Sequence, residues 1–142
     1  RMIVIDTSAL LAIMGDEPER RAFNERIESA AGVSISAASL LEARIVLFAR
    51  SGENAVLALD AFLLKSGIAV AEVSPRVGDI AFDAYRHYGR GTGHPAALNY
   101  GDCFSYALAR QMDAPLLYKG NDFAQTDIRP AVAAIPAMLP MD

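Results

Sequence analysis

The sequence has little of what disulfide-bonded, zinc-binding or membrane proteins need. Its 142 residues include one cysteine, Cys103, which excludes a disulfide within the chain and fits a reducing cytoplasm. The two histidines, His87 and His94, have no matching cysteine or histidine pair for a structural zinc site. No apolar run approaches the roughly 20 residues of a membrane span, and the apolar start ends at Asp6, too early for a signal peptide. We therefore expect a cytoplasmic protein with no membrane partner.

Positive charge is also scarce. Lys and Arg number 13 against 17 Asp and Glu, which gives a formal net charge of −4, whereas nucleic-acid binding usually needs a positive surface. Hydrophobic residues make up 53% and charged residues 21%, as in an ordinary folded domain. We expect one domain over residues 1–142, and we interpret Arg1, which precedes Met2, as a remnant of cloning.

Short apolar segments alternate with longer segments of helical periodicity. Strands are predicted at residues 3–5, 33–36, 68–73 and 116–118, and a short edge strand from residue 128. Helices are predicted at residues 8–14, 16–31, 39–50, 53–65, 75–88 and 102–112. This order predicts an α/β fold with a central, mainly parallel sheet of four to five strands flanked by helices.

Four carboxylates follow predicted strands or begin the helices behind them: Asp6, Glu42, Asp102 and Asp122. The carboxyl ends of parallel strands meet at one edge of a sheet, which is where ligands bind. Acids brought together there repel one another, and a divalent cation removes that conflict. Carboxylate oxygens are the ligands that magnesium prefers. A metal held in this way suits the attack of water on a phosphodiester.

Each acid also has a purely structural interpretation. Asp6 suits the N-cap of the helix that follows it. Ser39 with Glu42, and Asn99 with Asp102, have the spacing of a capping box, and the last acid suits a turn. The metal interpretation gains weight because these acids border the core, where a carboxylate needs a partner.

The segments around these acids share a pattern with one known family. They read IDTSAL at residues 5–10, LEA at 41–43, LNYGDCFSYALA at 98–109 and LYKGNDF at 117–123, followed by Thr126 and Asp127. Together they resemble the PIN-domain nucleases, and within them the VapC-type toxins of toxin–antitoxin pairs. Motif order, spacing and chain length all agree, so the resemblance covers nearly the whole chain.

The resemblance implies a PIN-like fold and a Mg²⁺- or Mn²⁺-dependent endoribonuclease. It makes the metal-binding and catalytic set Asp6, Glu42, Asp102 and Asp122. Asp127 is a rival for the fourth place, and we favour Asp122. Hydrogen bonds to the metal-binding carboxylates are expected from Thr7, Ser8 and Asn99. The N-cap interpretation of Asn99 stays open.

The same resemblance implies the partners. Family members cut RNA, often transfer RNA, are inhibited by a small antitoxin and are usually dimers. The exposed face of the helix at 53–65 is a candidate dimer surface, although core packing explains most of its apolar positions. The four acids account for the whole net charge, so local basic contacts to RNA are compatible with it. The candidates are Arg44, Arg86, Arg90, Lys119 and Arg129.

Three rival functions each account for part of the sequence pattern. A phosphatase with Asp6 as nucleophile would carry a second aspartate at position 8, where the chain has Ser8. A receiver-type signalling domain needs an acid after the third strand, where the chain has Val73, Ser74 and Pro75. A catalytically silent relative would act only by binding its antitoxin and DNA, and the presence of all four acids argues against such degeneration.

Overall fold

Four parallel strands form the centre of the computed structural model, which describes residues 1–132. They are β1 (Met2–Ile5), β2 (Gly32–Ser36), β3 (Ile68–Ala71) and β4 (Leu116–Leu117). The order across the sheet is β3-β2-β1-β4, and every pair is parallel. This confirms the predicted parallel α/β sheet. The strand expected from residue 128 is present only as an isolated bridge between Leu116 and Pro130.

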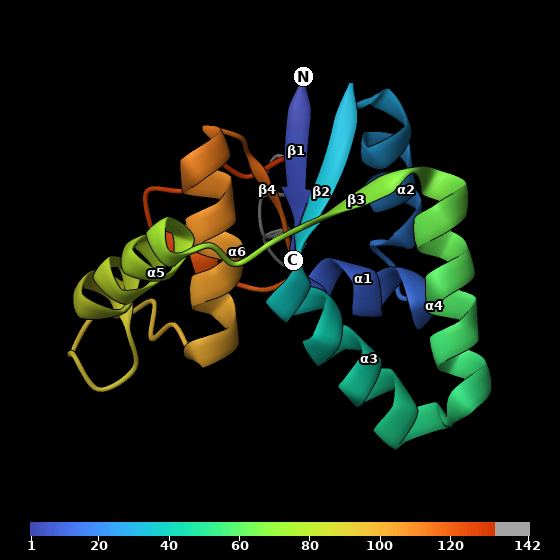
Figure 1. Ribbon diagram of the computed structural model, residues 1–142, viewed down its shortest axis with the longest axis horizontal. Helices are drawn as coiled ribbons and strands as arrows, with labels where there is room; N and C mark the ends of the chain where they lie inside the picture. The colour runs from blue at the N-terminus through green and yellow to red at the C-terminus, as the bar shows by residue number, and fades with distance from the viewer. Residues whose placement is uncertain (133–142) are drawn as a thin grey trace, which may run out of the picture.

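Helices cover both faces of this sheet (Figure 1). One side carries α1 (Thr7–Met14), α2 (Arg20–Ser29), α3 (Ala37–Ser51) and α4 (Glu53–Ser66), and the other carries α5 (Pro75–Tyr88) and α6 (Tyr100–Met112). A short 3-10 helix, η1 (Phe123–Gln125), follows β4. No helix among residues 1–132 combines the length and apolar character needed to cross a membrane.

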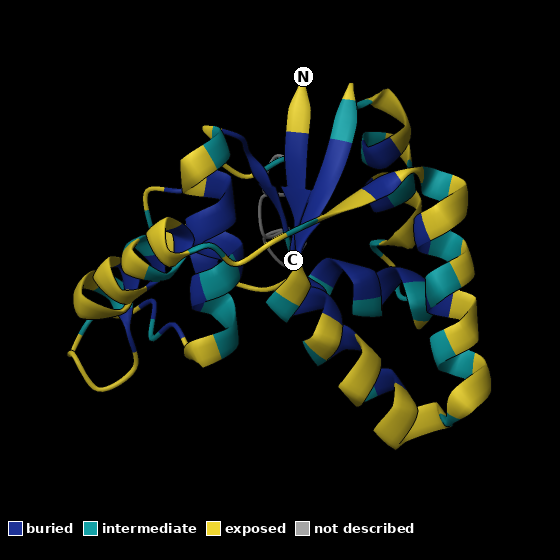
Figure 2. Cartoon of the chain, in the orientation of Figure 1, coloured by how far each residue is buried: buried dark blue, intermediate teal, exposed yellow. Residues whose placement is uncertain are grey.

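The central strands are buried on both faces because helices pack against each (Figure 2). Side chains of a strand alternate between its faces, so Ile3 and Ile5 join the core under α1–α4 while Val4 joins the core under α5 and α6. The strand β3 lies at the sheet edge and is largely exposed, with Val70 52% accessible. The carboxyl ends of β1 and β2 are thereby fixed between two helical layers.

Four helices begin at residues other than the predicted ones. The starts of α1, at Thr7, and of α6, at Tyr100, differ from the predicted residues 8 and 102 by one and two positions. The helix predicted from residue 16 begins at Arg20, because Asp16 adopts a left-handed conformation with φ of 51° and turns the chain. The helix predicted from residue 39 begins at Ala37, because the hydroxyl of Ser36 caps it by accepting the amide of Ala38. The predicted capping box between Ser39 and Glu42 is therefore wrong.

Candidate active site

Asp6 directly follows β1 and is 4% exposed. Its Oδ2 accepts the backbone N–H of Ser8 at 3.0 Å, which makes it the N-cap of α1. Its Oδ1 accepts the hydroxyl of Ser105 at 2.5 Å. The capping interpretation of Asp6 is confirmed, and the carboxylate is at the same time oriented by donors from two different helices.

Glu42 lies in the second turn of α3 and is half-buried. Its carboxylate packs against the backbone of α6: a Cβ built on Gly101 would lie 2.5 Å from Oε2 and 2.9 Å from Oε1 of Glu42. This contact places the Glu42 carboxylate beside the residue that precedes Asp102. Two acids that stand 60 positions apart in the sequence thus meet at the start of α6.

Asp102 lies in the first turn of α6 and forms a capping box with Asn99. Its Oδ2 accepts the N–H of Asn99 at 3.0 Å, and Asn99 Oδ1 accepts the N–H of Asp102 at 2.9 Å. Burial raises the pKa of Asp102 from 3.8 to about 7, against the lowering effect of the Asn99 amide, and the charges of Asp6, Asp122 and Glu42 raise it further. The other three predicted acids therefore lie near enough to Asp102 to act on it through their charges.

Asp122 is exposed and precedes η1, just beyond the end of β4. Asp127, its rival, is engaged elsewhere: it accepts the hydroxyl of Tyr106 at 2.6 Å and pairs with Arg110 at 2.9 Å. Burial would raise the pKa of Asp127, but the Tyr106 hydrogen bond and the Arg110 charge leave it below its ordinary value. Of these two acids, Asp122 is the one whose charge raises the pKa of Asp102, which favours Asp122 as the fourth acid.

The carboxylate oxygens of the four acids suit a hard divalent cation that keeps several of its bound waters. Among residues 1–132 no three Asp, Glu, His or Cys side chains stand close enough to enclose an ion. Magnesium does not need such a cage, because it keeps several waters and takes one or two carboxylates directly. The carboxylates available for such contacts are those of Asp102 and of the three acids whose charges act on it, Asp6, Glu42 and Asp122. A bound cation would offset the negative charges that raise the pKa of Asp102.

The residues expected to support the acids divide into three cases. Ser8 holds Asp6 through its backbone N–H, while its hydroxyl accepts the N–H of Lys119 at 3.0 Å. Asn99 caps α6, as its structural interpretation predicted. Thr7 donates its hydroxyl to the carbonyl of Ser39 at 2.9 Å and does not bond a carboxylate.

Ser105 is the supporting residue that sequence reasoning missed. It is 1% exposed and bonds Asp6 directly. The available signal was its spacing: it stands one helical turn after Asp102, so it faces the same side of α6. A serine at this place in an otherwise apolar helix face requires a hydrogen-bond partner.

Most of the basic residues predicted to contact RNA have acidic partners in the structure. The pairs are Arg44–Asp60, Arg86–Asp83, Arg129–Asp113, and Lys119 with both Glu17 and Glu19. Arg90, in the loop before α6, has no side-chain ion pair with any residue that the structure describes. Exposed ion pairs are worth little, so these contacts leave the prediction of RNA binding as it stands.

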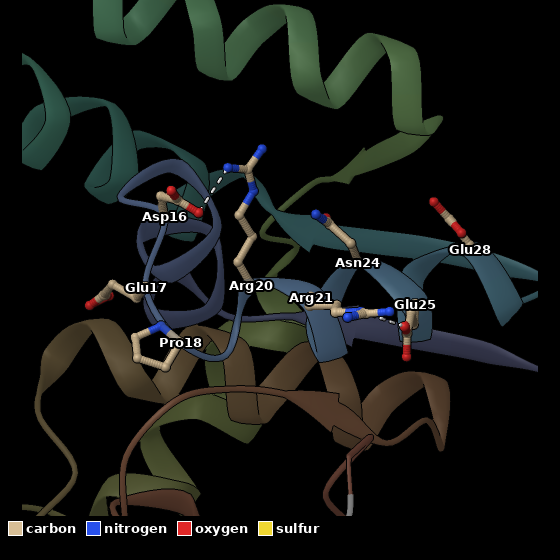
Figure 3. A pocket seen from close by; sticks show the side chains of 8 residues that line it. All are labelled: Asp16, Glu17, Pro18, Arg20, Arg21, Asn24, Glu25 and Glu28. Atoms are coloured by element: carbon tan, nitrogen blue, oxygen red, sulfur yellow. Dashed lines mark hydrogen bonds and ion pairs between the residues drawn. The ribbon is translucent and has the colours of Figure 1, made fainter.

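A separate hollow lies beside the turn between α1 and α2 and along α2 (Figure 3). Its charged side chains pair with one another, Arg20 with Asp16 at 3.0 Å and Arg21 with Glu25 at 3.4 Å. None of the four acids lines it. Most of its lining residues are exposed and four of them form these two ion pairs, which is typical of a solvated helix surface.

Comparison with known proteins identifies a family for the chain. The family model described as PIN domain matches residues 3–129. Ribonuclease VapC30 of Mycobacterium tuberculosis is 46% identical over 134 residues, which cover 94% of this chain and 100% of that protein.

Solved structures share the fold at lower identity. VapC20 of Mycobacterium tuberculosis, described as a sarcin-ricin loop cleaving toxin, superposes with a TM-score of 0.70 at 21% identity and covers 89% of this chain and 95% of its own. A toxin–antitoxin complex from Klebsiella pneumoniae superposes with a TM-score of 0.63 at 16% identity, over 86% and 90% of the two chains.

Proposed function

The chain belongs to the PIN-domain family and is a relative of the VapC ribonucleases, and we propose that it is an endoribonuclease whose four acids hold Mg²⁺ or Mn²⁺. Asp6, Glu42, Asp102 and Asp122 form the site, and the enzyme is the toxin of a toxin–antitoxin pair. The observation that carries the proposal is geometric: the Glu42 carboxylate packs against Gly101, the residue before Asp102 at the start of α6, and Asp6 is buried where β1 ends. Burial and the charges of the other three acids raise the pKa of Asp102 to about 7, which fits this arrangement. Acids gathered at the carboxyl edge of a parallel sheet repel one another when they are ionised. A bound cation offsets this repulsion and lets them stay ionised.

The residues of the chain have distinct roles in this proposal. Asp6 is held by Ser8 and Ser105, so its carboxylate is presented in one orientation. Asp102 is held by Asn99 on one oxygen, which leaves the other for a ligand. A bound divalent ion supplies a water of lowered pKa and neutralises charge on the phosphate oxygens. Glu42 and Asp122 would accept hydrogen bonds from waters on a bound ion.

A cleavage experiment tests the proposal directly. Purified protein is incubated with labelled transfer, ribosomal and messenger RNA in Mg²⁺, in Mn²⁺ and in EDTA. We expect discrete fragments with either ion, none in EDTA and none from Asp6→Asn. Asp79→Asn makes the same chemical change at an exposed aspartate of α5 and should cut like the unaltered protein. Intact RNA of all three classes under both ions would contradict the proposal.

The proposal includes an antitoxin and a second copy of the chain as partners. Its support is a set of large apolar side chains that stay uncovered: Leu41, Ile45 and Phe48 of α3 are 57–58% exposed and lie at helical spacing on one side of it. On α4, Leu59 and Leu63 are buried as core packing predicted, whereas Leu57 and Leu64 are 57% and 86% exposed. Apolar surface of this kind marks protein interfaces. Light scattering of the protein alone should give the mass of a dimer.

A further inference from the structure

Three polar side chains are buried together where β1 ends between α3 and α6. Ser39 is 0% exposed, Ser105 is 1% exposed and Asp6 is 4% exposed. Buried hydroxyl groups are nearly always hydrogen-bonded, because an unpaired one is costly. Here each finds its partner in the next: Ser39 Oγ lies 3.0 Å from Ser105 Oγ, which lies 2.5 Å from Asp6 Oδ1.

The direction of these hydrogen bonds follows from the number of protons. A serine hydroxyl has one proton to donate and two lone pairs to accept. Ser105 gives its proton to Asp6, so in the contact with Ser39 it can only accept, and Ser39 must donate. The backbone around Ser39 is fixed in turn, because its carbonyl accepts the hydroxyl of Thr7. The result is a one-way chain from Ser39 through Ser105 to the carboxylate.

Ser105 is also well placed to set the geometry of the site. It lies on the same helix as Asp102, one turn further along. The helix that carries one metal-binding carboxylate therefore also orients the other. The second oxygen of Asp6 is held by Ser8 of α1, so donors from two helices fix the rotation of the carboxylate.

We propose that Ser105 is a positioning residue that aims the Asp6 carboxylate at the metal and that Ser39 acts only through Ser105. The inference deepens the proposed nuclease function and depends on it. Groups that orient a metal ligand commonly change metal affinity or activity by about 10- to 100-fold when they are removed. Nothing in this role requires either serine to touch metal or RNA.

The test combines metal binding with kinetics in single and double variants. The Kd for Mn²⁺ is measured from the electron paramagnetic resonance signal of free Mn²⁺, without RNA. We expect Ser105→Ala to raise this Kd about tenfold or more and to lower kcat with KM for RNA little changed. Ser39→Ala should have a smaller effect of the same kind. The double variant should match Ser105→Ala alone, because the two serines act in series.

Matched variants separate positioning from general loss of packing. Ser34→Ala removes a buried serine hydroxyl of β2 that bonds none of the acids and should leave Mn²⁺ affinity unchanged. Ser105→Thr keeps the hydroxyl and should retain most of the affinity. If Ser105→Ala does not fold, Ser105→Cys carries the same test, since its thiol is only a weak donor.

Some outcomes would overturn the inference without touching the nuclease. Wild-type Mn²⁺ affinity in Ser105→Ala would do so, and so would independent, multiplying effects of the two serines. Conversely, a protein whose Mn²⁺ affinity falls in Ser105→Ala but which cuts no RNA would contradict the proposed function and leave the positioning role intact.

Discussion

The Glu42 carboxylate occupies the space that a side chain at Gly101 would fill. A Cβ at position 101 would stand 2.5 Å from Glu42 Oε2, closer than real Cβ contacts come. The φ of Gly101 is not positive, so the backbone there does not require glycine. The glycine of the LNYGDCFSYALA segment is explained by the room it leaves for an acid of the site.

We predict that Gly101→Ala separates stability from activity. Alanine favours a helix over glycine by about 1 kcal/mol, and the atom it meets is the end of a flexible side chain, so the fold should keep its stability or gain some. The Glu42 carboxylate must move, and RNA cleavage should fall about tenfold or more. Urea unfolding and the rate of RNA cleavage measure the two effects.

Gly78→Ala is the control for this prediction. Gly78 is the glycine within α5, and nothing lies within 4 Å of its Cβ position. The substitution should raise stability by up to about 1 kcal/mol through helix propensity alone and leave cleavage unchanged. Full activity in Gly101→Ala would show that the place of the Glu42 carboxylate is not critical.

The metal-free protein should lose stability as the pH rises through about 7, and Asp102→Asn should abolish this loss. The folded-state pKa of Asp102, about 7, lies above its ordinary value of 3.8, so the folded protein holds this proton more tightly. Stability from the protonated group is complete below about pH 4 and is lost as the pH rises through 7. Asparagine cannot ionise, and its amide oxygen can still accept the Asn99 N–H.

The expected gain of Asp102→Asn over the wild type is near zero at pH 4 and about 1–2 kcal/mol at pH 8, after allowance for solvent screening of a half-buried group. Urea unfolding in EDTA at several pH values measures it. A variant less stable than the wild type at pH 8 would mean that the carboxylate serves mainly as the cap of α6.

Mg²⁺ should stabilise the wild-type protein more at pH 8 than at pH 6, because the Asp102 proton competes with the ion. At about ten times its Kd, a ligand adds about 1.4 kcal/mol, which raises Tm by about 5 °C for a chain of this size. Thermal unfolding with Mg²⁺ and with EDTA at each pH gives the difference. Asp102→Asn should lose most of the shift, and Asp79→Asn should retain it.

Asp122→Asn should impair activity and spare stability, whereas Asp127→Asn should lower stability and spare activity. Asp122 is exposed and acts on Asp102 through its charge, so its loss should impair Mn²⁺ binding and cleavage at nearly unchanged stability. Asp127 joins the segment after η1 to α6 through Tyr106 and Arg110. Its loss should cost about 1 kcal/mol of stability and leave the folded molecules active. The reverse pattern would make Asp127 the fourth acid.

The parallel sheet and the acids at its edge were predictable, because both depend on patterns close together in the sequence. Apolar runs separated by helical periodicity predict βα units. Asp6 follows its strand directly, and its place at the sheet edge needs no further information. The capping box of Asn99 with Asp102 was equally local and is confirmed.

The errors concern residues whose conformation depends on distant contacts. Ser36 and Ser39 both suit an N-cap, and what distinguishes them is Ser105, 66 residues from Ser39 in the sequence, whose hydroxyl bonds Ser39. Glu17 likewise reads as a residue of a helical first turn but bonds Lys119 beyond β4. Local patterns contain no information about such partners.

The pairing of β4 with β1 has a consequence for protein synthesis. The first strand made by the ribosome has the last one as its neighbour in the sheet, and Asp122 is made only after β4. Until about residue 122 has emerged, the nascent chain has an open edge on β1 and an incomplete set of acids. The complete set of four acids is therefore assembled only after residue 122 has been translated, so the site forms late in synthesis although its first acid, Asp6, is made at the start.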